Sequence, residues 1–180
     1  HKEYKGTIIN RVSIESRPSI VNERDRLGDY EIDLIVGPKN KGAILSIIDR
    51  LSRECILEKL DDKTSLSACG KTIKSLLLRE KKVYTITSDN GTEFTDHQIV
   101  SKELKIDYYF AHPYASYERG SIENLNGLVR QYIPKGTEFT NIENTTLKEV
   151  QNKLNNRPRK VLGFLTPIEY TKKYYNEIKN

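Results

Sequence analysis

The feature that most limits the fold of this sequence is a change of hydrophobic period near residue 64. Three segments before it have the two-residue period of β-strands: 30–37, 42–48 and 54–60. In the first segment, Ile32 and Leu34 lie on one face and Asp33 on the other. From Thr64, which suits a helix N-cap, to about Glu80, apolar residues recur at helical spacing.

Beyond residue 80, predicted strands and helices follow one another. The strands are 83–88 and 107–111, and the helices are 95–104, 121–133, 146–156 and 166–178. Thr95 and Gln98 are placed for a capping box, Pro134 ends one helix, and Pro167 suits the first turn of the last. This order predicts an α/β fold with a mixed sheet flanked by helices. We expect an N-terminal arm or linker over 1–27 and one core domain over 28–180.

Composition limits the class of protein but not its function. The chain of 180 residues is 36% hydrophobic and 31% charged, as expected of a single globular domain without a membrane-spanning run. The net charge of +5, from 30 basic and 25 acidic residues, permits a polyanionic partner without requiring one. Cys55 and Cys69 lack metal-type spacing and are predicted to be reduced, which favours a cytoplasmic location.

Two acids stand where α/β proteins place functional groups. Asp89 directly follows the predicted strand 83–88 and begins the turn "DNG". Asp-Asn-Gly is typical of hairpins, but the next predicted element is a helix, so Asp89 is expected at the carboxyl edge of the sheet. Glu123 lies in the first turn of the helix 121–133, and residues 90–122 separate it from Asp89. Structural roles, as turn former and as helix-terminal acid, remain the alternatives.

Four acids are candidates for a third member of this site: Asp29, Glu31, Asp33 and Asp49. Asp33 has apolar neighbours on both sides, and a buried aspartate is usually paired or bound to a metal. Asp29 and Asp49 border turns and have ordinary capping explanations. Two aspartates and a glutamate suit Mg²⁺ or Mn²⁺, and two such ions roughly 3.5–4 Å apart suit chemistry at phosphorus.

These motifs resemble a known family. "TSDNGTEF", followed at that spacing by Glu123, resembles the retroviral-type integrase core that bacterial insertion-sequence transposases of the DDE class share. "GDYEIDLIVG" is similar to the block around the first aspartate of that family, and "SYERGSIENLNGLVRQYIPKGTEF" resembles the block around its glutamate. The likeness extends from about Asn10 to Tyr170. Two departures are Ser116, where tyrosine is common, and Arg130, where lysine is commoner.

The resemblance implies a ribonuclease H-like fold with a five-stranded mixed sheet flanked by helices. It also implies a transposase catalytic domain, a metal-dependent polynucleotidyl transferase that cleaves DNA 3′-ends and transfers them to target DNA. Asp33, Asp89 and Glu123 would be catalytic and would hold Mg²⁺ or Mn²⁺, with two ions expected. The residues expected to contact DNA are Asn90, Arg119, Asn126, Arg130, Lys135, Arg157 and Arg159.

The same resemblance implies transposon ends and target DNA as partners, a homodimer or higher oligomer, and a bacterial cytoplasmic, nucleoid-associated location. Two other functions stay open at this point. One is a ribonuclease H-like, structure-selective nuclease without strand transfer. The other is a catalytically decayed domain that only binds DNA.

Overall fold

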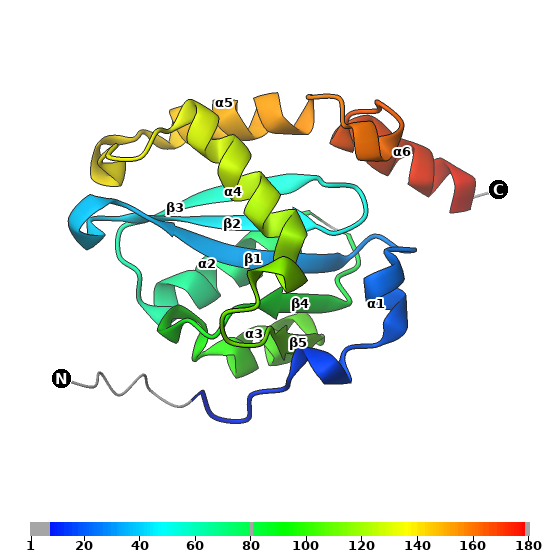
Figure 1. The fold of residues 1–180 in the computed structure, drawn as a ribbon, viewed down its shortest axis with the longest axis horizontal. Helices are drawn as coiled ribbons and strands as arrows, with labels where there is room; N and C mark the ends of the chain where they lie inside the picture. The colour runs from blue at the N-terminus through cyan, green and yellow to red at the C-terminus, as the bar shows by residue number, and fades with distance from the viewer. Residues whose placement is uncertain (1–7, 80, 179–180) are drawn as a thin grey trace.

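The computed structural model describes residues 8–79 and 81–178, and a five-stranded sheet forms its centre (Figure 1). The strands are β1 (Asp29–Val36), β2 (Ala43–Asp49), β3 (Cys55–Leu60), β4 (Thr85–Ser88) and β5 (Asp107–Phe110). Their order across the sheet is β3-β2-β1-β4-β5. The pairs β1–β2 and β2–β3 are antiparallel, whereas β1–β4 and β4–β5 are parallel. The mixed sheet predicted from the sequence is therefore confirmed.

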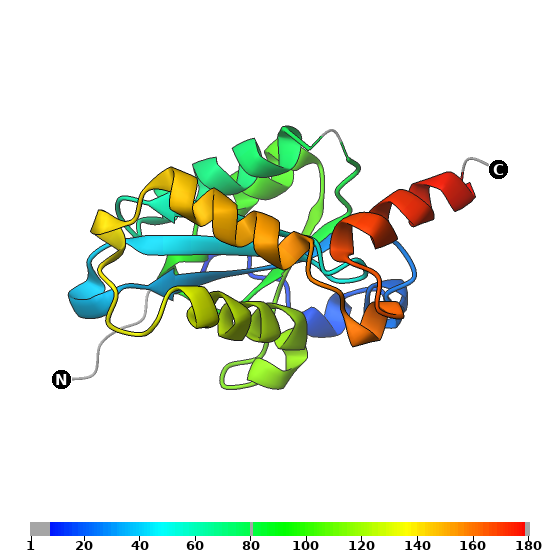
Figure 2. The ribbon, with the colours of Figure 1, turned by 90° about the horizontal axis from the view of Figure 1, so that it is seen from above.

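Helices cover both faces of this sheet, and Figure 2 shows it between α2 and α4. The α-helices are α1 (Ser19–Glu23), α2 (Ser65–Leu77), α3 (His97–Leu104), α4 (Gly120–Tyr132), α5 (Asn144–Asn155) and α6 (Pro167–Ile178). Short 3₁₀ turns are η1 (Ile14–Ser16), η2 (Pro38–Asn40), η3 (Thr92–Phe94), η4 (Ser116–Arg119), η5 (Phe139–Asn141) and η6 (Lys160–Leu162). Within the described ranges, no helix has the length and apolar character needed to cross a bilayer.

The hydrophobic core consists of two clusters, one on each face of the sheet, and successive side chains of β1 point alternately into them. Ile32 packs in the cluster that includes α2 and α3, whereas Ile35 packs in the cluster that includes α4 and α5. Because successive strand residues point to opposite faces, Asp33 lies on the α4 side. Cys55 and Cys69 are buried, one in each cluster, and both are free thiols, as predicted.

Several helix ends follow the sequence signals. The Thr64 side chain accepts a hydrogen bond from the Ser67 amide (3.3 Å) and caps α2. Helix α4 ends at Tyr132, shortly before Pro134, and Pro167 is the first residue of α6. The predicted end of the α2 helix at Glu80 lies outside the described residues.

The capping box predicted at Thr95 and Gln98 is wrong. Residues 92–94 form the turn η3, and the Thr95 hydroxyl donates to the Thr92 carbonyl (3.0 Å) within it. Helix α3 consequently begins at His97, with Asp96 at its N-cap and no side-chain capping bond. The Thr95 hydroxyl is bonded within the 3₁₀ turn and therefore does not cap α3.

The N-terminal segment is less extended than predicted. Residues 1–7 of the predicted arm lie outside the described part of the chain, and the remainder contains η1 and α1. Ser13 forms a parallel bridge to Phe110, and the Phe110 amide donates to the Val12 carbonyl (2.9 Å). Arg17 is buried and donates to the Thr87 hydroxyl (3.0 Å). The segment therefore packs along β5.

At the opposite edge of the sheet, side-chain amides of α5 contact the backbone of β3. Asn155 accepts from the Cys55 amide and donates to the Cys55 carbonyl, both at 2.8 Å. Gln151 accepts from the Leu57 amide (2.9 Å). These bonds hold α5 against the outer edge of β3.

A buried ion pair fixes the start of α4 on the sheet. Glu31, in β1, is fully buried, and its carboxylate pairs with the buried Arg50 guanidinium. The second oxygen of Glu31 accepts from the Ile122 amide (2.8 Å), in the first turn of α4. Arg50 also donates to the Val21 carbonyl (3.2 Å) at α1. One carboxylate thus links the sheet, α1 and the beginning of α4.

We predict that Glu31→Ala destabilises the fold strongly. Removing one partner leaves the Arg50 charge buried without compensation, which costs about 3–5 kcal/mol. The free energy of unfolding from guanidinium denaturation measures this loss. Glu177→Ala, at an exposed ion pair on α6, is the control and should change stability by less than about 1 kcal/mol. Equal losses in the two variants would contradict the assigned role of Glu31.

Candidate active site

The pairing of β1 with β4 brings two of the predicted acids together. The strand register aligns Glu31 with Thr87. Asp33 follows Glu31 by two residues, and Asp89 follows Thr87 by two residues. Asp89 is the first residue after β4. Asp89 consequently lies at the carboxyl end of β4, where α/β folds place their sites, and Asp33 lies beside it within β1.

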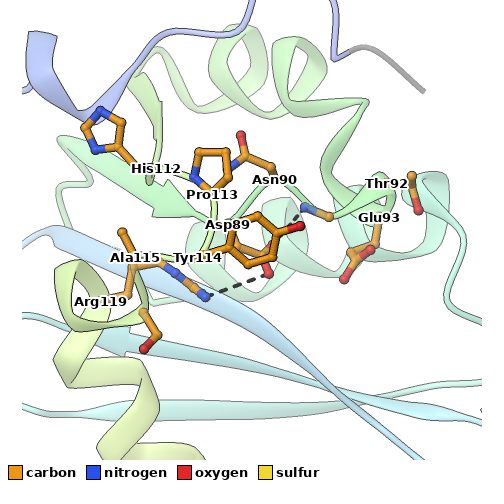
Figure 3. Close-up of a pocket in the computed structure, with 11 residues that line it drawn as sticks. Asp89, Asn90, Thr92, Glu93, His112, Pro113, Tyr114, Ala115 and Arg119 are labelled. Carbon is orange, nitrogen blue, oxygen red and sulfur yellow. Dashed lines mark hydrogen bonds and ion pairs between the residues drawn. The ribbon is translucent and has the colours of Figure 1, made fainter. Parts of the chain in front are cut away.

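One guanidinium faces both carboxylates. Arg119 Nη1 lies 3.8 Å from Asp33 Oδ2, and Arg119 Nη2 lies 3.7 Å from Asp89 Oδ2. Figure 3 shows the Arg119 side chain directed at Asp89. The side chain is buried, yet its Nε and Nη1 atoms have no hydrogen-bond partner. Arg119 therefore supplies positive charge to the pair at ion-pair distance without closing hydrogen bonds to either carboxylate.

Asp33 is held in a largely buried position. Its Oδ1 accepts from the Leu34 amide and its Oδ2 accepts from the Asn126 side chain, both at 2.9 Å. Burial raises the pKa of Asp33 to about 6; Arg119 opposes this shift, and the negative charges of Asp89 and Glu93 add to it. A bound cation would stabilise the ionised form of a carboxylate in this setting. Carboxylate oxygens are ligands that suit Mg²⁺ or Mn²⁺. The aspartate pair therefore fits a divalent cation.

The turn after Asp89 is built from side-chain hydrogen bonds. Asp89 Oδ1 accepts from the Gly91 amide (2.9 Å), and Asn90 donates to the Ala111 carbonyl (2.7 Å) beyond β5. Gly91 has a φ of −65°, and Asn90 is not among the residues with positive φ. Asn90 and Gly91 therefore do not form a left-handed turn. The Asn90 amide bends the chain by tying it to the neighbouring strand end.

Glu123 occupies the predicted first turn of α4 but is exposed to solvent. Asn126, three residues further along the helix, contacts Asp33 and accepts a hydrogen bond from Ser46 (2.8 Å). In residues 8–79 and 81–178, no three His, Cys, Asp or Glu side chains are grouped so as to hold a metal ion. The structure brings Asp33 and Asp89 together and leaves Glu123 apart from them.

A cavity of about 540 Å³ opens beside Asp89 (Figure 3). Glu93, Tyr114 and Arg119 are among its lining residues, and the Tyr114 ring is fully exposed. The loop that carries Tyr114 is closed by His112, whose amide and Nδ1 contact Glu118 at 2.8 and 2.7 Å. Sequence reasoning gave no role to Glu93 or to the His112–Glu118 pair, because neither has the spacing of a motif.

The residues predicted to contact DNA differ in their surroundings. Asn90, Arg119 and Asn126 surround the aspartate pair, as described above. The others lie elsewhere, and three of them are bonded within the chain. Arg130 donates to the Val36 carbonyl (3.4 Å), Arg157 to Gln131 (2.9 Å) and Arg159 to the Leu154 carbonyl (3.0 Å). Lys135 is exposed after α4.

The family match and the relatives of this chain agree with one another. Residues 26–116 match the family described as "Integrase core domain". The chain is 46% identical, over 173 residues, to the transposase for insertion sequence element IS4351 of Bacteroides fragilis, covering 96% of this chain and 53% of that protein. It is 38% identical over 171 residues to transposase InsI for insertion sequence element IS30A of Escherichia coli K12, covering 93% and 44%. The chain thus spans about half the length of these relatives.

Solved structures share the fold at low sequence identity. The catalytic core domain of BIV integrase has a TM-score of 0.63 and 21% identity, covering 84% of this chain and 98% of that one. A chain of the simian T-cell lymphotropic virus intasome in complex with PP2A regulatory subunit B56 gamma has a TM-score of 0.66 and 18% identity, covering 79% and 53%. The expected ribonuclease H-like fold is thereby confirmed.

We predict that ionised Asp33 destabilises the metal-free protein. The pKa of Asp33 in the folded protein, about 6, lies above its ordinary value of 3.8, so folding favours the protonated carboxyl. This contribution to the free energy of unfolding is present at low pH and is lost as the pH rises through 6. Relative to Asp33→Asn, wild-type stability should fall by about 3 kcal/mol between roughly pH 3 and pH 7. Urea denaturation in EDTA across this range measures the difference.

The exposed Asp61 is the matched control, and Asp61→Asn should follow the wild-type pH profile. A stability difference between wild type and Asp33→Asn that stays constant with pH would contradict the environment assigned to Asp33.

Proposed function

The chain belongs to the integrase core domain family, and from this premise we propose that it is the catalytic core of a bacterial insertion-sequence transposase. The observation that carries the proposal is the pair Asp33 and Asp89, held on the adjacent strands β1 and β4 with Arg119 facing both. Relatives named as insertion-sequence transposases support the choice within the family. The predicted arm over 1–27 and core over 28–180 are part of this proposal.

In the proposed site, Asp33, Asp89 and Glu123 would hold Mg²⁺ or Mn²⁺, with two ions expected. When bound, such ions stabilise negative charge on the attacking and leaving oxygens at phosphorus. Asn126 orients Asp33 through its hydrogen bond, and Asn90 fixes the backbone that carries Asp89. Arg119 partly offsets the charge of the two aspartates. The exposed side chain of Glu123 would turn toward the two aspartates while the first turn of α4 stays in place.

The proposed reaction has two phosphoryl-transfer steps. Water first attacks a phosphodiester at the transposon end, breaking the bond to the 3′-oxygen and leaving a 3′-hydroxyl and a 5′-phosphate. That hydroxyl then attacks a phosphodiester of target DNA, forming a new bond while the target strand's own 3′-oxygen leaves. No covalent enzyme intermediate is required. DNA is therefore the proposed substrate and partner, the full protein is proposed to act as a dimer or higher oligomer, and its proposed place is the bacterial nucleoid.

We predict that Glu123→Gln abolishes cleavage and strand transfer. The substitution removes one carboxylate ligand but little volume, so activity with Mg²⁺ or Mn²⁺ should fall by at least about a thousandfold. A gel assay on labelled DNA carrying a transposon end measures nicking and joining. DNA binding, followed by fluorescence anisotropy, should be retained.

The control for this variant is Glu149→Gln, which changes an exposed glutamate on α5. It should keep wild-type activity. Full activity of Glu123→Gln with metal and DNA would exclude the proposed triad.

A second experiment separates transposition from the two alternatives. Supplied with a pre-cut 3′-end, a transposase should join it to a second duplex, whereas a structure-selective nuclease should only cut. A decayed domain should bind DNA without either product. We expect joining that requires the divalent ion, and a product pattern limited to cleavage would overturn strand transfer as the function.

A further inference from the structure

A second cavity, of about 360 Å³, lies beside α4 and is rimmed by arginines. Arg24 follows α1, Arg53 lies in the turn between β2 and β3, and Arg159 precedes η6. Three segments far apart in the sequence therefore each bring one guanidinium to the same hollow. Apolar side chains, among them Ile48 and Leu125, form part of its lining.

This cavity is separate from the one beside Asp89, and the two share no lining residue. Gly120, Asn124 and Leu128 line it at a spacing of four residues, which places them on one face of α4. Glu123 and Asn126 lie off that face. The helix consequently carries the proposed catalytic groups on one side and borders the arginine cavity on another.

The positive charge in the cavity is not compensated locally. None of its lining residues is acidic. Burial, followed by repulsion from Arg24, lowers the pKa of Arg53 to about 10. The carboxylates of Glu31 and Asp49 oppose this shift, but both are already bonded elsewhere: Glu31 to Arg50 and the Ile122 amide, and Asp49 to the backbone amides of Gly28 and Ser52. A negatively charged ligand in the cavity would therefore be attracted by the three arginines.

The three arginines differ in how far they are already engaged. Arg53 donates to the Ser121 hydroxyl, and Arg159 donates to the Leu154 carbonyl while its buried Nε has no partner. Within the described part of the chain, the Arg24 side chain makes neither a hydrogen bond nor an ion pair. Two guanidiniums are thus held in place by the fold, and the third is available to a ligand.

The backbone at Arg24 also departs from what arginine prefers. Its φ of 58° and ψ of 45° are left-handed, a conformation that glycine and asparagine adopt at lower cost. Arg53 has a φ of 63° as well. Strained positions of this kind often mark functional residues. Here the strain accompanies the placement of two guanidiniums at one cavity.

We propose that Arg24, Arg53 and Arg159 form a binding site for a phosphodiester of the DNA backbone, with the adjoining sugar against the apolar lining. Guanidinium forks match phosphate geometry, and an apolar floor suits the deoxyribose between two phosphates. The site rests on the proposed function, because it requires that the protein bind DNA. It would hold the duplex at a point away from the scissile phosphate and so fix the orientation of the DNA across α4.

The test compares two substitutions of basic residues that share one backbone conformation. Arg24→Asn removes the guanidinium, and asparagine tolerates the left-handed backbone. Lys105→Asn is the matched control, because Lys105 is also left-handed (φ 55°, ψ 53°) and follows α3 on the opposite face of the sheet. DNA binding is measured by fluorescence anisotropy with a labelled duplex, in EDTA, over a series of salt concentrations.

We expect Arg24→Asn to bind DNA about tenfold more weakly at low salt, with a slope of log K against log salt smaller by about 1. Lys105→Asn should match the wild type. Thermal melting should show both variants folded. Equal affinity and slope in Arg24→Asn and wild type would overturn the site, as would failure of the wild type to bind DNA at low salt.

Inorganic phosphate and pyrophosphate, tested by thermal melting, form a second arm. If they stabilise the wild type but not Arg24→Asn, while DNA affinity is equal in the two, the cavity holds free phosphate and the DNA assignment is wrong. The proposed function fails separately, through absence of metal-dependent nicking and joining. Loss of DNA binding in Arg24→Asn would support the cavity even in that case.

Discussion

The carboxylate of Glu31 is a fully buried charge, and the position of α4 depends on how that charge is satisfied. One oxygen pairs with Arg50 and the other accepts from the Ile122 amide at the helix start. Because a buried carboxylate without partners is very costly, the first turn of α4 has little freedom to slide along the sheet. Arg119 immediately precedes that turn, so the same contact determines where its guanidinium meets Asp33 and Asp89.

Arginine, more than lysine, serves the interior of this protein. Arg17, Arg50 and Arg119 are buried, and burial lowers the pKa of the first two. A delocalised guanidinium is less strongly hydrated than an ammonium group and reaches several acceptors at once. Positive charge can therefore lie beneath the surface close to the acids.

The strands and the long helices could be predicted because period and burial agree along them, as Ile32 and Ile35 show on opposite faces of β1. Asp89 could be placed at a strand end from its pattern, whereas its pairing with Asp33 came from the family resemblance, because four acids were candidates. Helix α1 was missed because a helix of five residues contains too few turns to show a period. The ion pair of Glu31 with Arg50 and the cavity that Arg24 and Arg53 share bring together residues from different segments, which no local sequence pattern indicates. For Glu123 the sequence spacing fits a motif, but that spacing does not predict that its side chain faces solvent.

The outer strands of the sheet are both occupied along part of their free edges. Side-chain amides of Asn155 and Gln151 take the place of a neighbouring strand beside β3, and the chain around Ser13 does so beside β5. Exposed strand edges invite pairing with another chain, and here those backbone groups already have partners within the molecule. Assembly with a second copy would therefore proceed through helices and loops, because extension of the sheet across two molecules would first require one of these edge contacts to open.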